Sequence, residues 1–240
     1  MRGIYSATSI MLASLDYQGL IAKNLANANT PGYKAERARM DDFGHLLLEL
    51  NGDDGDPLGL GVVATEALLD LNQGPLRSTE RALDLAISGT AFFSVQTAEG
   101  TRLTRDGSFG LNAARQLVTS DGHLVLGTAG PITLPEGEVS IAEDGRVFVN
   151  GTAAGQLALA VVEDPARLAK AGGNLFEGAG RLATAGEATV LQGYLEGSNV
   201  DIAGDMSHMM AIYRTYEAAQ RIILMQSQTM DAATTQVGQV

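Results

Sequence analysis

The residues of this 240-residue chain that could do chemistry are few and lie far apart. The three histidines, His45, His123 and His208, are too widely separated for the ligand spacing of a metal site. The carboxylates Asp41-Asp42 and Asp53-Asp54 are paired by adjacency only, and nothing around them predicts the desolvation that would tune one as a general acid and the other as a base. The sequence therefore predicts no enzyme, no cofactor and no metal site.

Three short motifs admit both a functional and a structural interpretation. The aspartates of residues 51–57 could suggest calcium, but the full loop spacing and its terminal glutamate are missing, which favours a solvated loop. The glycine-rich segment 172–180 has neither the lysine ending of a phosphate loop nor the glycine spacing of a dinucleotide loop. Asn150-Gly151-Thr152 matches a glycosylation acceptor, a pattern short enough to arise by chance.

Composition limits the class of protein. An apolar fraction of 45% is enough for a folded core, whereas the formal net charge of −12 argues against nucleic acid or an anionic membrane surface as a partner. The chain has no cysteine, which fits both a reducing compartment and a protein that leaves the cell without a disulfide. No apolar run reaches the roughly 18 residues that span a bilayer, so we expect no membrane insertion.

The two ends of the chain share one apolar rhythm. Residues 3–15 carry no charge and residues 222–240 carry one, Asp231. Steps of four and three are typical of a coiled-coil seam, but the flanking residues are mostly Ala, Ser, Thr, Gln and Asn, which suits helices with neighbours on several sides. The rhythm comprises Ile4, Thr8, Met11, Leu15, Gln18, Ala22 and Leu25 at the front, and Ile202, Met206, Met209, Tyr213, Tyr216, Gln220, Ile223, Ser227, Met230, Thr234 and Val237 at the back.

Helix boundaries follow from turn residues. The first helix is expected over about residues 3–28 and to stop at Asn27–Gly32, because Pro31 disfavours a helical residue before it and Gly32 permits a left-handed exit. Its uncharged start is diluted by hydroxyl residues and continues the rhythm, so we interpret it as mature structure and not as a cleaved leader. The last helix is expected from about Asp201 to the end, with Asn199 and Asp201 as candidate N-caps.

Between the helices, short apolar runs alternate with turn dipeptides. Asp106-Gly107, Asp121-Gly122 and Asp144-Gly145 predict tight hairpins. Strands are expected at 62–65, 83–87, 92–96, 102–104, 117–119, 124–126, 139–141, 146–149 and 157–162. The predicted fold class is α+β: a discontinuous helical coiled-coil layer from residues 1–34 and 200–240, a linker at 35–57, and a central antiparallel β domain of short strands at 58–199.

Four groups of residues go beyond composition. The run Asn24-Leu25-Ala26-Asn27-Ala28-Asn29-Thr30-Pro31-Gly32-Tyr33-Lys34 resembles the "NLANxxTxGYK" signature of the bacterial flagellar rod and hook axial proteins. Residues 83–89 with Phe92-Phe93 resemble the family's central "LDLAIxGxGFF" stretch, and residues 104–109 its "TRDGSF" hairpin. Residues 192–200 and 214–217 resemble the "QGxLExSNV … RxYE" signature. The matches occur in order and span nearly the whole chain.

The resemblance implies a structural subunit of the flagellar rod, located in the basal body. It also implies export through the flagellar type III apparatus without a cleaved leader. The partners would be copies of the chain and neighbouring rod and hook axial proteins, with the terminal helices forming the inner layer around a channel. The length fits the proximal or distal rod type, and Ile4-Tyr5 and residues 130–137 look slightly more like the proximal type.

We predict that both helical ends are mobile in the isolated chain and become ordered on assembly. Ordering costs roughly 1–2 kcal/mol per residue of backbone entropy, and burial of about 25 cal/mol per Å² of apolar surface offsets it only when neighbours are present. The exit from the inner layer would be set by Asn27, Asn29 and Pro31. The predicted subunit-interface residues are Ile4, Thr8, Met11, Leu15, Ala22, Leu25, Asn27, Asn29, Pro31, Met206, Met209, Tyr213, Tyr216, Ile223 and Met230.

Two other classes stay open at this point. A secreted β-rich adhesin or phage tail component, trimerised by its helices, would be expected to carry its coil at one end with more charged flanks. A carbohydrate-active enzyme would need a pocket with converging carboxylates, and it would lack the tryptophan that often binds sugars. The mass in solution tests the first alternative, and a search of the β domain for such a pocket tests the second.

Overall fold

The computed structural model describes residues 2–42, 62–164, 167–178, 180–183 and 187–237. His45, the acidic segment 51–57 and most of the expected linker 35–57 lie outside these ranges. The chain forms two compact units: a helical unit of Met1–Ala26, Glu36–Leu68 and Asp201–Val240, and a β unit of Asn27–Ala35 and Leu69–Val200. Residues 27–34, which the sequence ranges assigned to the helices, thus pack with the strands, because residues 32–35 are buried there.

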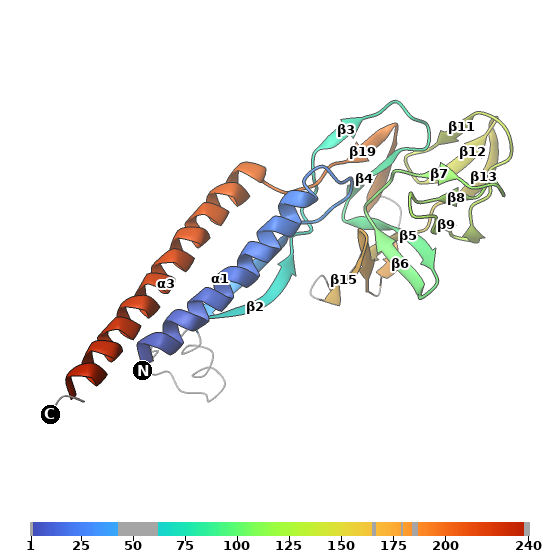
Figure 1. Cartoon of the computed structure of the whole chain (residues 1–240). Coiled ribbons are helices and arrows are strands. Elements are labelled where there is room, and N and C mark those ends of the chain that lie inside the picture. Colours follow the sequence, from blue (N-terminus) through green and yellow to red (C-terminus); the bar gives the residue numbers. More distant parts are fainter. Residues whose placement is uncertain (1, 43–61, 165–166, 179, 184–186, 238–240) are drawn as a thin grey trace. The chain divides into compact units, whose positions relative to one another are not determined.

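The helical unit contains α1 (Arg2–Ala26), α3 (Ile202–Val237), β1 (Glu36–Asp42) and β2 (Val62–Leu69). Figure 1 shows α1 and α3 side by side, with both chain termini at the same end of the pair, so the helices run antiparallel. The strands β1 and β2 form a separate two-stranded sheet. No helix in the described part of the chain is both long and apolar enough to cross a membrane.

The helix ends follow the predicted capping residues. After α1, the amide of Thr30 donates to the carbonyl of Asn27, and Gly32 adopts a left-handed φ of 68°. At the start of α3, Asp201 Oδ1 accepts a hydrogen bond of 3.1 Å from the Gly204 amide, so Asp201 is the N-cap. The other candidate cap, Asn199, instead binds the backbone of residues 35, 70 and 72.

The β unit is built from short strands, as predicted. They are β3 (Leu76–Ser78), β4 (Leu85–Gly89), β5 (Ala91–Thr97), β6 (Gly100–Thr104), β7 (Gly110–Leu111), β8 (Leu117–Val118), β9 (Leu124–Gly127), β10 (Gly130–Pro131), β11 (Val139–Ile141), β12 (Arg146–Val149), β13 (Thr152–Gln156), β14 (Leu159–Val162), β15 (Ala169–Gly172), β16 (Leu175–Glu177), β17 (Gly180–Leu182), β18 (Ala188–Gln192) and β19 (Tyr194–Glu196).

These strands form one large sheet and three smaller ones in the described residues. The large sheet has the order β15-β16-β6-β5-β9-β8-β7; in addition β14 pairs with β5, β17 pairs with β14, and β10 pairs with β9. The strands β11, β12 and β13 form a meander, while β18 pairs with β4 and β19 pairs with β3. The described strand pairs are antiparallel, which confirms the predicted class of the β domain.

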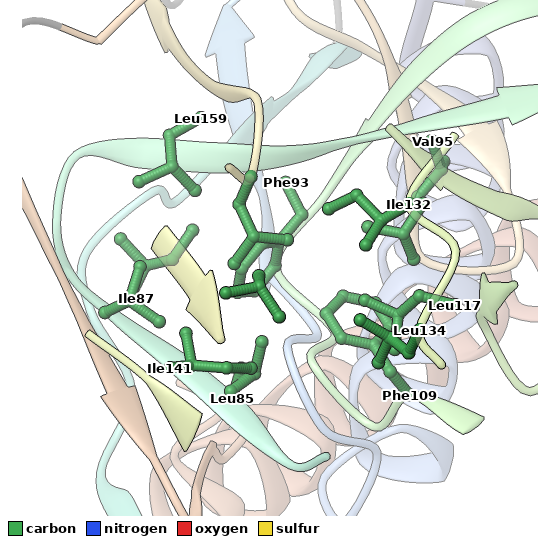
Figure 2. Packing of buried hydrophobic residues seen from close by; sticks show 14 of the residues in the cluster. Leu85, Ile87, Phe93, Val95, Phe109, Leu117, Ile132, Leu134, Ile141 and Leu159 are labelled. Carbon is green, nitrogen blue, oxygen red and sulfur yellow. The ribbon is translucent and has the colours of Figure 1, made fainter. Parts of the chain in front are cut away.

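Strand β5 lies at the centre of the β unit because both of its faces are buried. Phe93 and Val95 point into the main core, where Figure 2 shows them among residues such as Leu85 and Leu134. The rings of Phe93 and Phe109 meet edge to face at 5.0 Å. Phe92 points the opposite way and packs on Phe176 at 5.6 Å in a second cluster. The first five residues of β5 are therefore all buried, including the polar Ser94.

The three predicted Asp-Gly turns differ in detail from the observed ones. Asp121-Gly122 and Asp144-Gly145 lie in the hairpins β8–β9 and β11–β12, but only the glycine of each pair has a positive φ. Asp106-Gly107 does not join paired strands, so that hairpin prediction is wrong. A Cβ on Gly107 would lie 1.7 Å from the Leu85 carbonyl oxygen, so the glycine permits close backbone approach. Two consecutive positive φ values occur instead in the turns Asn150-Gly151, between β12 and β13, and Gly173-Asn174, between β15 and β16.

Candidate functional site

The contact between α1 and α3 is formed by a stripe of α3 residues spaced by four and three. Met209, Ile212, Tyr216 and Ile223 are half-buried along this stripe, and Ala219 is buried. On α1 the buried residues are Ala7, Ala13, Ser14, Ile21 and Asn24. Because α1 contacts β1 as well as α3, its buried face is wider than the seam of a two-helix coil.

The predicted seam coincides with this packing at alternate positions between residues 11 and 25 of α1 and between residues 209 and 223 of α3. Of the predicted interface residues, Met11, Leu25, Met209, Tyr216 and Ile223 are half-buried, whereas Thr8, Leu15, Ala22, Met206, Tyr213 and Met230 are exposed within the single chain. The side chains of Ile4, Thr234 and Val237 are not among those described. Elsewhere the packed stripe is displaced by one residue, as at Ala219 in place of Gln220, because a small side chain lets two helices approach closely.

A groove of about 510 Å³ lies between the C-terminal half of α1 and the N-terminal part of α3. Its walls are mostly apolar and include the exposed side chains of Met206, Met210 and Tyr213. The remaining lining residues are Gln18, Leu25, Met209 and Arg214. Exposed apolar side chains gathered at one place are typical of a surface that another protein covers.

The residues after α1 are held within the β unit. The Asn27 side chain accepts a hydrogen bond from the Thr30 hydroxyl at 3.2 Å, and the Pro31 carbonyl accepts one from Asn174 Nδ2 at 2.9 Å. Asn29 is exposed. A Cβ on Gly32 would lie 2.3 Å from the Asp106 amide nitrogen, so only glycine fits that position without a shift of backbone.

Three charged side chains, Lys34, Arg105 and Glu196, form a buried charge cluster in the β unit. Lys34 Nζ lies 2.6 Å from Glu196 Oε1, and Arg105 Nη1 lies 3.1 Å from Glu196 Oε2. All three side chains are at most 2% exposed. The cluster joins segments far apart in the sequence, because Lys34 and Glu196 are separated by 162 positions.

Backbone groups supply further partners to the charge cluster, although the buried Nε of Arg105 has no hydrogen-bond partner among the described residues. Lys34 Nζ donates to the Asn72 carbonyl at 2.7 Å, and Arg105 Nη2 donates to the Gly89 carbonyl at 2.6 Å. Glu196 Oε1 also accepts a hydrogen bond from the Gly74 amide at 2.9 Å. Two cations therefore share one carboxylate. Each cation also donates a hydrogen bond to a peptide carbonyl.

Burial sets the electrostatics of the charge cluster. Desolvation lowers the pKa of Lys34, and the hydrogen bond and charge of Glu196 oppose that shift only in part. Desolvation likewise lowers the pKa of Arg105, whose guanidinium lies 4.8 Å from the centre of the Phe92 ring. Both cations depend on Glu196 for compensation, since an unpaired buried charge is strongly unfavourable.

The segments around Lys34 and Glu196 are also joined by hydrogen bonds outside the charge cluster. The Gly32 amide donates to the Glu196 carbonyl at 2.8 Å, and the Ala35 amide donates to Asn199 Oδ1 at 2.7 Å. The segment that follows α1 and the segment that precedes α3 are thus hydrogen-bonded to each other within the β unit.

Sequence reasoning did not identify the charge cluster. Lys34, Arg105 and Glu196 were noted only as letters within the family signatures, and none was predicted as a site residue. The available signal was that each lies within two positions of a glycine: Gly32, Gly107 and Gly197. In a sequence alone, such charges are more often solvent-exposed.

A second cavity of about 550 Å³, in the β unit, bears on the enzyme alternative. Glu143 and Asp144 both line it, but Asp144 is tied to the amide and guanidinium of Arg146. The hydrogen bond from the Arg146 amide, aided by its guanidinium, lowers the pKa of Asp144, opposite to the shift of a general acid. In the described part of the chain, no group of three or more histidine or carboxylate residues could hold a metal ion.

Comparison with known proteins identifies the family. Residues 86–149 match the flagellar hook protein FlgE/F/G D1 domain, and residues 191–236 match the C-terminal region of flagellar basal body rod FlgEFG proteins. The chain is 32% identical to the flagellar hook-basal body complex protein FlhO of Bacillus subtilis, with both chains covered completely. It is 33% identical to the flagellar basal-body rod protein FlgG of Borreliella burgdorferi, covering 93% of this chain and 94% of that protein.

A third relative agrees with these matches. The flagellar basal-body rod protein FlgF of Escherichia coli is 34% identical, with 92% of each chain covered. The matched regions include Arg105 and Glu196 and most of α3. On the strength of these full-length relatives, the chain belongs to the family of flagellar hook and basal-body rod proteins.

Proposed function

We propose that this protein is a structural subunit of the flagellar basal-body rod, which assembles through its terminal helices into the axial drive shaft around the export channel. The observation that carries the proposal is the paired α1 and α3, which leave large apolar side chains exposed along a mostly apolar groove. A single chain buries only part of this surface, and contact with further subunits would bury the rest.

The charge cluster supports a role in the transmission of mechanical force. Force applied along either helix reaches the β unit through residues 27–35 or 196–200, and hydrogen bonds join these two segments to each other. A buried ion pair with several backbone partners resists separation, because each unpaired charge would remain in an apolar site. Torque passed from subunit to subunit would therefore act on both chain ends together.

Several finer features belong to the proposal. We propose other copies of the chain and neighbouring axial proteins as its partners, the type III apparatus as its export route, and the basal body as its location. The relatives include proteins named both FlgF and FlgG, and the proximal position along the rod is our preference from the sequence resemblance. We also propose that the helical ends gain order on assembly, because further subunits supply burial that the single chain lacks.

Localisation tests the proposed function. A short epitope inserted at the exposed Asn150-Gly151 turn leaves the charge cluster and the helices untouched. Purified basal bodies would be decorated with antibody and viewed by electron microscopy, with the untagged strain as the control. We expect label on the rod. Label that is missing from the rod of a motile tagged strain, while the protein accumulates elsewhere, would contradict the proposal.

A further inference from the structure

Strand β15 turns its one long side chain toward the protein. Ala169, Ala171 and Gly172 are exposed, whereas Lys170 is half-buried. Lys170 is paired across the hairpin with Phe176, which is fully buried, and directly opposed residues of an antiparallel pair share one face. A strand with one covered face normally places apolar residues there and polar residues in water. The reversed order in β15 indicates that Lys170 has a partner on the covered face.

The partner of Lys170 is the segment that follows α1. Lys170 Nζ donates a hydrogen bond to the Lys34 carbonyl at 2.8 Å. The same nitrogen lies 4.0 Å from the centre of the Tyr33 ring, within the range of a cation–π contact, and Tyr33 is only 4% exposed. One ammonium group therefore holds the backbone of one residue and the side chain of the residue before it.

The turn of the hairpin β15–β16 adds a second contact to the same segment. Asn174 Nδ2 donates to the Pro31 carbonyl at 2.9 Å. The carbonyl of Asn174 in turn accepts a hydrogen bond from Thr104 Oγ1 at 3.0 Å, and β16 pairs with β6 at Thr104. The hairpin is thus attached both to the large sheet and to residues 31–34.

The segment that precedes α3 is held by a different part of the β unit. Strand β19 pairs with β3, and the Gly197 amide donates to the Pro75 carbonyl at 2.8 Å. Asn199 Nδ2 donates to the Asp70 carbonyl at 2.7 Å. The two segments therefore have separate attachments, in addition to the hydrogen bonds that join them to each other.

We propose that the hairpin β15–β16 clamps residues 31–34 to the large sheet, with Lys170 and Asn174 as its positioning residues. The clamp is a property of the single chain, and its loss loosens residues 32–35 while residues 193–200 stay in place. Its part in force transmission rests on the proposed function: force applied along α1 passes through residues 31–34 into β16, β6 and β5, which are paired in that order.

Hydrogen–deuterium exchange of the purified full chain tests the clamp. Lys170→Met keeps the length of the side chain but removes its charge and its donors. The peptide of residues 30–36 contains the bonded amides of Gly32 and Ala35. Loss of one hydrogen bond changes a local opening equilibrium by about tenfold, so we expect this peptide to exchange about tenfold faster. Residues 193–200 should exchange as in the native chain.

Two asparagine substitutions give a matched pair. Asn174→Gly removes the amide that binds Pro31 but keeps a residue that tolerates the φ of 59°, so it should produce the same selective change. Asn150→Gly is the same substitution at a φ of 49°, but the Asn150 side chain accepts from the Glu138 amide. This control should speed exchange at Glu138 and leave residues 30–36 unchanged.

Two results would overturn the clamp. Unchanged exchange of residues 30–36 would show that the side chains of Lys170 and Asn174 do not hold this segment. Equal acceleration of residues 30–36 and 193–200 would show that the hairpin supports the whole β unit and not one segment of it. If Lys170→Met does not fold, Asn174→Gly is judged by the same two criteria.

Swimming in a viscous medium tests the role of the clamp in force transmission. Cells that carry Asn174→Gly should lose speed under load more steeply than cells that carry Asn150→Gly. Equal speeds, with both variants present in basal bodies at native amounts, would overturn that role. Absence of the native chain from basal bodies contradicts the proposed function instead and leaves the exchange result unaffected, so the two failures are distinguishable.

Discussion

Replacement of Glu196 by glutamine tests the physical account of the charge cluster most directly. The substitution keeps the shape of the side chain but removes the one carboxylate that contacts both Lys34 and Arg105. If the remaining oxygen keeps its bonds to Lys34 and Gly74, the new amide group faces Arg105 Nη1 at about the present 3.1 Å. Two donors then oppose each other, and two buried cations lose their counter-charge.

The expected cost follows from this geometry. Removing one partner of a buried ion pair costs about 3–5 kcal/mol, because the other charge stays buried without compensation. Here the lost carboxylate serves two cations, so we expect a loss at the upper end of that range. Since the whole stability of a domain is about 5–15 kcal/mol, Glu196→Gln should remove a large part of the stability of the β unit.

The matched control is Glu177→Gln. Glu177 also pairs with an arginine, Arg102, at 3.5 Å, but its side chain is 63% exposed. Exposed pairs contribute at most about 1 kcal/mol, so this variant should unfold almost like the native chain. Urea unfolding followed by circular dichroism gives the free energies, and amide exchange of peptides from the β unit shows where protection is lost.

A double variant separates charge from packing. If uncompensated charge causes the loss, adding Lys34→Met to Glu196→Gln removes one stranded cation and should restore part of the stability. The double variant would then lose less stability than the sum of the losses of the two single variants. The reasoning is refuted if Glu196→Gln destabilises the chain by no more than Glu177→Gln does.

Three further substitutions test other parts of the structure. Burial raises the pKa of Asp106 above its ordinary 3.8, so the folded chain holds that proton more tightly than the unfolded chain does. The folded chain therefore loses stability as pH rises from 3.8 through the raised pKa. Asp106→Asn should remove this pH dependence from the unfolding free energy measured in urea. Gly32→Ala should cost at least about 1–3 kcal/mol of backbone strain by urea unfolding, whereas Gly110→Ala, whose Cβ meets nothing within 4 Å, should cost far less. Asp201→Ala should cost about 1 kcal/mol and speed amide exchange in the first turn of α3, and unchanged exchange there would argue against the cap.

The fold was predictable where local signals were strong. Helices α1 and α3, the antiparallel class of the β unit, and the bounds of β11 and β12 follow from apolar periodicity and turn residues. Strands such as β13 and β15 were not predicted. Their side chains are mostly exposed, and alanine and glycine give them no apolar alternation. They are strands because they pair with β12 and β16, and such pairing is absent from a local pattern.

The helical seam was predictable only in part, for a related reason. Hydrophobicity favours the large side chains Met206 and Tyr213 as seam residues, whereas packing favours positions where helices approach closely, as at Ala219. Both choices give steps of four and three, so the rhythm alone does not separate them. The consequence is functional: the large side chains that pairing leaves outside are the ones available to another subunit.

The charge cluster shows why a signature can be recognised before its physical role is known. Glu196 lies 91 positions from Arg105 and 162 from Lys34, so no spacing rule relates the three residues. Closing loops of this length carries an entropic cost, so we expect the charge cluster to form late in folding, once the strands between its residues have paired. Lys34 and Glu196 can meet only when both ends of the β unit are present, and a local sequence pattern contains no trace of such a contact.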